Sequence, residues 1–67
     1  MRNGNYEIIF KDGSKAIRQI LFIMPDKENK DKMIINLPEL GKNGAFDINT
    51  GICTNEAGEY WFKIHLR

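Results

Sequence analysis

The amino-acid sequence predicts an all-β protein, built as a small antiparallel meander of five to six short strands. Two observations support this prediction. Apolar residues alternate with polar ones over several segments, and turn-forming residues separate those segments at short intervals. The predicted turns are Asp12-Gly13, Asn43-Gly44, Asn49 to Gly51 and Asn55 to Gly58. A chain of 67 residues is sufficient for one domain, which we take to span residues 1–67.

The first predicted hairpin is centred on Asp12-Gly13, a dipeptide that favours a tight reversal between two strands. In the strand before it, Tyr6, Ile8 and Phe10 would share one face because side chains alternate along a strand. The turn itself is therefore expected to join two antiparallel neighbours.

The returning strand, residues 15–24, starts with alternation and then becomes continuously apolar from Ile20 to Met24. A helix capped by Ser14 is the alternative for this segment, since several apolar residues also fall at helical spacing. Its isoleucine and phenylalanine content and the preceding turn favour a strand. The continuous apolar run predicts burial on both faces of the strand.

Residues 25–32 carry three acids and three bases and no apolar side chain other than Pro25, so we expect a solvated loop. The next strand would place Met33, Ile35 and Leu37 inward and end before Pro38. This interpretation leaves the charged loop as the connection between the second and third strands.

Asn43-Gly44 is predicted to reverse the chain before a fourth strand in which Phe46 and Ile48 share a face. A loop over residues 49–51 and a short strand over residues 52–54 follow. In the last strand, one face would be core and the other aromatic and basic. The core face would hold Tyr60, Phe62, Ile64 and Leu66, and the other face Trp61, Lys63, His65 and Arg67.

Such a sheet must cover the apolar run at Ile20 to Met24. It can curl into an SH3- or OB-like barrel, or a second chain can cover it. We expect dimerisation to complete the fold, because a domain this short buries only about 60% of its unfolded surface and its single cysteine allows no internal disulfide. The predicted self-association residues are Ile20, Phe22 and Met24.

Composition narrows the possible functions. Ten basic and nine acidic residues give a net charge of +1, so any charged partner must be met by a local patch. No apolar run approaches the roughly 18 residues of a membrane span, and no secretory segment follows Met1, so we expect a cytoplasmic protein with no membrane partner. His65 and Cys53 are too few to hold a metal, and no nucleotide-binding motif is present. We therefore expect no cofactor and no catalytic residues.

Trp61 is the most informative single residue, because tryptophan often dominates protein interfaces. With Lys63, His65 and Arg67 it would anchor a partner, and we predict a protein partner. The alternative for Trp61 is a packed residue that covers the second face of a barrel. We therefore predict a non-catalytic, homodimeric protein-binding module, such as a small phage or mobile-element inhibitor of a host protein. The alternatives are a barrel that binds single-stranded nucleic acid through Trp61 and the bases, and a structural subunit of a larger assembly.

Overall fold

A computed structural model describes residues 2–65 of the chain. The regular elements of this part are all strands, which confirms the all-β prediction. They are β1 (Gly4–Phe10), β2 (Lys15–Pro25), β3 (Lys32–Leu37), β4 (Lys42–Asp47), β5 (Ile52–Thr54) and β6 (Tyr60–Ile64). The described part contains no helix of the length and apolar character needed to cross a membrane.

The six strands form an antiparallel meander that closes into a small barrel. Each strand pairs with its neighbour in the chain, and β1 pairs with β6 to close the sheet. The closing ladder joins Ile8 to Ile64, Ile9 to Lys63 and Phe10 to Phe62. Closure is thus achieved within one chain, in a meander order that differs from the Greek-key order of an OB-fold.

The turn at Asp12-Gly13 is confirmed. The Phe10 N–H donates to the carbonyl oxygen of Ser14 at 2.8 Å, and the Asp12 carboxylate accepts the N–H and hydroxyl of Ser14 at 2.9 and 2.6 Å. Gly13 has a φ of 88°, a backbone conformation that would be strained for a residue with a side chain. The sequence therefore specifies this reversal locally.

The prediction of a turn at Asn43-Gly44 is wrong. Both residues lie inside β4, and the chain reverses earlier, over Pro38 to Gly41. Gly41 supplies the positive φ, at 62°. The loops predicted around Gly51 and Gly58 are present, each with its glycine at positive φ.

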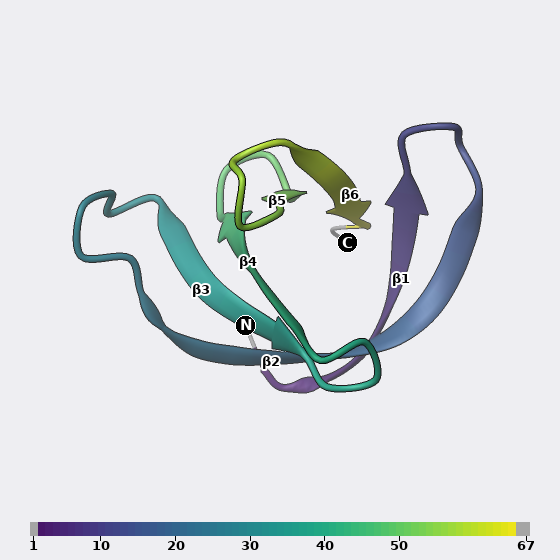
Figure 1. Ribbon diagram of the computed structural model, residues 1–67, viewed down its shortest axis with the longest axis horizontal. Helices are drawn as coiled ribbons and strands as arrows, with labels where there is room; N and C mark the ends of the chain where they lie inside the picture. Colours follow the sequence, from purple (N-terminus) through teal and green to yellow (C-terminus); the bar gives the residue numbers. More distant parts are fainter. Residues whose placement is uncertain (1, 66–67) are drawn as a thin grey trace.

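β2 is a single strand of 11 residues, so the helical alternative for residues 14–24 is wrong. In Figure 1 it curves beneath the barrel, with β1 along its first half and β3 along its second half. Its register against β3 shifts between Phe22 and Met24, which makes Ile23 the extra residue of a β-bulge. Beyond it, the charged loop is exposed from Lys27 to Asp31.

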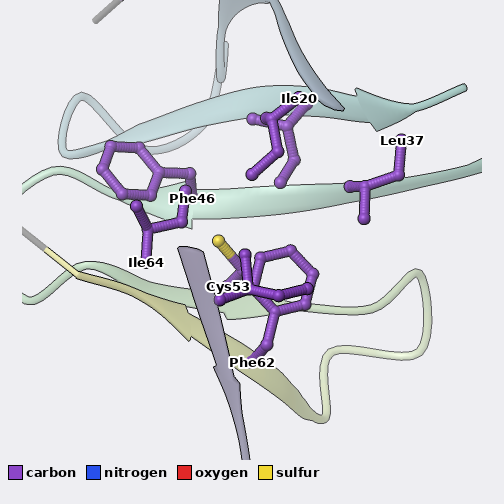
Figure 2. Close-up of a cluster of buried hydrophobic side chains, with 8 residues drawn as sticks. Ile20, Leu37, Phe46, Cys53, Phe62 and Ile64 are labelled. Carbon is purple, nitrogen blue, oxygen red and sulfur yellow. The ribbon is translucent and has the colours of Figure 1, made fainter. Parts of the chain in front are cut away.

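The core lies inside the barrel, where side chains from all six strands converge (Figure 2). The fully buried members are Ile8, Ile20, Ile35, Leu37, Phe46, Cys53, Phe62 and Ile64. The inward positions predicted for β1 and β3 are confirmed, although Tyr6, Phe10 and Met33 are only partly buried against the cluster. Ile48, predicted to share a strand face with Phe46, lies in the turn after β4 and is exposed.

Candidate binding surface

A β-bulge in β6 changes the faces predicted for the last strand. Cys53 pairs with Phe62, whereas the next residue, Thr54, pairs with Tyr60, so Trp61 is the extra residue. The prediction that Tyr60 faces the core is wrong, because the bulge moves it outward and leaves it 40% exposed. Phe62 and Ile64 are buried as predicted.

The bulge also turns Trp61 toward one end of the barrel interior. Its side chain is half-buried against the core, with the ring centroid 4.9 Å from that of Phe62. Gly44 pairs with the inward-facing Ile35, and a Cβ atom added to Gly44 would lie 3.0 Å from Cζ3 of Trp61. Trp61 therefore packs where Gly44 leaves space, and is not simply a neighbour of Lys63 on the outer surface.

Lys63 does lie on the outer surface, in a row that crosses four strands. It pairs with Ile9 of β1 on one side and with Ile52 of β5 on the other. Ile9 pairs in turn with Lys15 of β2. Lys15 and Lys63 are exposed and both isoleucines are half-buried, so the apolar surface of Ile9 lies between two basic side chains and that of Ile52 lies beyond Lys63.

A second outer row runs beside the first. Ile17 of β2 is 65% exposed and pairs with Glu7 of β1. The backbone N–H of His65 donates to the carbonyl oxygen of Glu7 at 3.3 Å, which brings the exposed His65 to this row. We call the two rows together the isoleucine-lysine face. It consists of Glu7, Ile9, Lys15, Ile17, Ile52, Lys63 and His65.

The other predicted site residues are spread over different environments. Arg67 lies outside the described residues. Of the residues predicted for self-association, Ile20 is fully buried in the core and Phe22 is half-buried, with its ring 5.5 Å from that of Phe46. Met24 is 46% exposed. Within one chain, therefore, the apolar run is buried only on its inward side, and Met24 is the predicted residue whose side chain a partner can reach most readily.

In the part of the chain that the structure describes, groups that could perform chemistry do not gather in one place. Cys53 is buried, and burial raises the pKa of its thiol to about 12, so the reactive thiolate is suppressed. Among residues 2–65, no group of three or more histidine, cysteine, aspartate or glutamate side chains is arranged to hold a metal ion. Each lowered carboxyl pKa has a local cause, as at Asp12, where hydrogen bonds from Ser14 favour the ionised form.

A shallow groove runs beside β4, next to Trp61. One part has a volume of about 330 Å³ and is lined by Lys42, Asn43, Asn55, Glu56, Ala57 and Trp61. A second part of about 250 Å³ shares Asn43, Asn55 and Glu56 and extends to Ile34, Gly44 and Ala45. The groove and the isoleucine-lysine face have no lining residue in common.

Comparison of the chain with known protein families, curated proteins and solved structures finds no match. The function of these surfaces is therefore inferred from their own residues.

Sequence reasoning missed the isoleucines of the outer surface. Ile9 and Ile17 occupy outward positions of their strands, where an alternating pattern normally has polar residues. That departure was a usable signal, because a large apolar side chain on the solvent face of a strand often marks a contact. Ile52 gave no such signal, since β5 has only three residues.

Proposed function

We propose that this protein is a non-catalytic protein-binding module and that the isoleucine-lysine face contacts its partner. The observation that carries the proposal is the outer row in which Ile9 and Ile52 flank Lys63 and Ile9 also neighbours Lys15. An interface needs apolar area for affinity and charge for orientation, and this face offers both.

The charges on the face indicate the kind of partner. Lys15 and Lys63 are both exposed, with Glu7 as the acidic group in the neighbouring row. The preferred partner is a protein surface with acidic side chains around an apolar centre. Desolvating the isoleucines would supply most of the affinity, at roughly 25 cal/mol per Å² of apolar area removed from water before the costs of association.

We further propose that the module self-associates through the exposed part of the apolar run, at Met24 and the neighbouring Ile23. These side chains are 46% and 53% exposed. Two side chains provide far less than the roughly 800 Å² per partner of a standard interface, so we expect a weak homodimer unless further surface joins the contact. A homodimer that occupies a partner's surface would act as an adaptor or inhibitor, and a small phage or mobile-element inhibitor of a host protein is the form we favour.

Binding to single-stranded nucleic acid is the second candidate, because a half-buried tryptophan offers a ring face for stacking. Two facts weaken it. Trp61 packs toward the barrel end, whereas Lys63 belongs to the outer row, and the net charge is only +1. A role as structural subunit would instead require extended assembly by the isolated chain.

The test compares two matched substitutions of exposed isoleucines. Ile17→Asp alters the isoleucine-lysine face, and Ile48→Asp places the same charge in the β4–β5 turn as the control. Proteins captured from a candidate host by the wild type should be lost with Ile17→Asp and retained with Ile48→Asp, and binding of the purified partner should change little between low and high salt.

Equal capture by both variants would refute the proposal. Tight binding to an oligothymidine that weakens by orders of magnitude as salt rises would favour the nucleic-acid candidate. Light scattering behind a sizing column, across concentration, separately measures the homodimer, which Met24→Asp should disrupt. Large assemblies in that measurement would indicate the structural subunit.

A further inference from the structure

Beside Trp61, the edge of β4 is open. β4 pairs with β3 along its whole length, from Lys42 to Asp47. On its other side, the ladder with β5 joins only Ala45 to Thr54 and Phe46 to Cys53. Within residues 2–65, Lys42 and Asn43 therefore have a strand on one side only.

The backbone at this edge is held by a side chain in place of a strand. The N–H of Asn43 donates to Oε1 of Glu56 at 3.4 Å, a long contact compared with the usual 2.7 to 3.2 Å of a backbone hydrogen bond. A carbonyl oxygen of an added strand could replace this contact at a shorter distance. Glu56 would then be free to pair with a cation.

The first part of the groove lies along this same edge, and the second part continues over Gly44 and Ala45, where β4 is also paired with β5 through Ala45 and Thr54. Lys42 and Trp61 line only its first part, Gly44 and Ala45 only its second, and Asn43 lines both. An extended chain in the groove would thus follow β4, with Trp61 at one end. The ring of Trp61 fits there because Gly44 has no side chain. A Cβ atom added to Gly44 would lie within 3.1 Å of two ring atoms.

We propose that this groove is a second binding site, separate from the isoleucine-lysine face, and that it takes an extended peptide segment of a protein partner. The segment adds a short strand to the open edge of β4 and accepts the N–H of Asn43. One apolar side chain of the segment packs on Trp61, and a neighbouring basic side chain pairs with Glu56. This is recognition by strand addition, in which backbone bonds supply affinity and alternate side chains supply selectivity.

The charges around the groove support a peptide of mixed character. Glu56 lines both parts of the groove and would meet the basic residue of the peptide, whereas Lys42 lines only one end and would meet an acidic residue or a terminal carboxylate. Asn55 is already occupied, since its Oδ1 accepts the N–H groups of Ala57 and Glu59 at 3.0 and 2.9 Å. The Oδ1 atom of Asn55 is therefore not open to the ligand, whereas its Nδ2 donates to Oε1 of Glu59 at 3.4 Å and keeps a second N–H.

The experiment selects ligands from a displayed library of random heptapeptides and measures synthetic copies of the enriched sequences. The chain has a single tryptophan, so its fluorescence reports directly on the groove. We expect bound peptide to shift the emission of Trp61 and the amide resonance of Asn43. Glu56→Gln should weaken binding of a base-containing peptide about fivefold, and Ala57→Arg, which fills the groove from an exposed turn, should abolish it.

Lys63→Ala is the matched control, because it alters the isoleucine-lysine face and leaves the groove intact. It should not change the affinity for the peptide. It should, however, weaken binding of the protein partner to the isoleucine-lysine face. The two proposals can thus fail independently. Enriched peptides that bind Ala57→Arg as tightly as the wild type would overturn the inference, as would a library without binders or a response of Trp61 to oligothymidine alone.

Discussion

Replacing Gly44 by alanine tests the packing on which both the barrel end and the groove depend. A Cβ atom at this position would lie 2.5 Å from the backbone oxygen of Thr54 and 3.0 Å from Cζ3 of Trp61. The first distance is roughly 0.8 Å short of an ordinary C···O contact of about 3.3 Å. Because the oxygen belongs to the backbone of β5, the strand itself would have to move.

The magnitude follows from two opposing effects. Overpacking a well-filled site costs about 1–3 kcal/mol, and the backbone overlap places Gly44→Ala toward the upper part of that range. Replacing glycine by alanine also restricts the unfolded chain, which stabilises the fold by about 0.4–1 kcal/mol. The net loss should be about 1–2 kcal/mol, equivalent to about 5–15 °C in Tm for a domain of this size.

Urea denaturation followed by circular dichroism measures this loss without relying on the fluorescence of Trp61, which the substitution itself would alter. Gly4→Ala is the matched control, because a Cβ atom at Gly4 meets nothing within 4 Å and that residue also lies in a strand. It should leave the protein as stable or slightly more so. If Gly44→Ala behaves like this control, the close approach of Gly44 to Thr54 and Trp61 is not present in solution.

Three further results are expected. The thiol of Cys53 should react with a disulfide reagent at pH 8 only as fast as the protein opens, because it is buried with a pKa raised to about 12; rapid labelling in native buffer would contradict its burial. Phe62→Ala should remove about 3–5 kcal/mol of stability, enough to leave much of a small domain unfolded by circular dichroism, since the ring is fully buried. Hydrogen bonds from the backbone of Asn49 and Thr50 lower the pKa of Asp47 below its ordinary 3.8. The contribution of the Asp47 carboxylate to stability is therefore present above about pH 4, and it is lost as the pH falls through the lower pKa of the folded protein. Asp47→Asn should therefore flatten the acid side of a plot of urea midpoint against pH, and an unchanged slope would show that those bonds do not favour the ionised form.

Alternation alone predicts most of the core, because a strand repeats every two residues and the inward positions need no knowledge of the partner strand. Examples are Ile8, Ile35 and Leu37, which occupy predicted inward positions and are each fully buried. The failures come from contacts between distant segments. Asn43-Gly44 has the composition of a turn, yet Gly44 is required inside β4 because Thr54 and Trp61 leave no room for a side chain.

The bulge in β6 shows why the candidate site could not be predicted from the last strand by itself. The face on which Trp61 lies depends on which residue of β6 pairs with Thr54. That pairing is set by the three-residue strand β5. Because β5 ends at Thr54, the ladder stops there, Trp61 turns toward Gly44 and the start of β4 is left without a second neighbour. One short strand thus accounts for two features that the sequence did not predict: the separation of Trp61 from the outer row of Lys63, and the open edge proposed to receive a peptide.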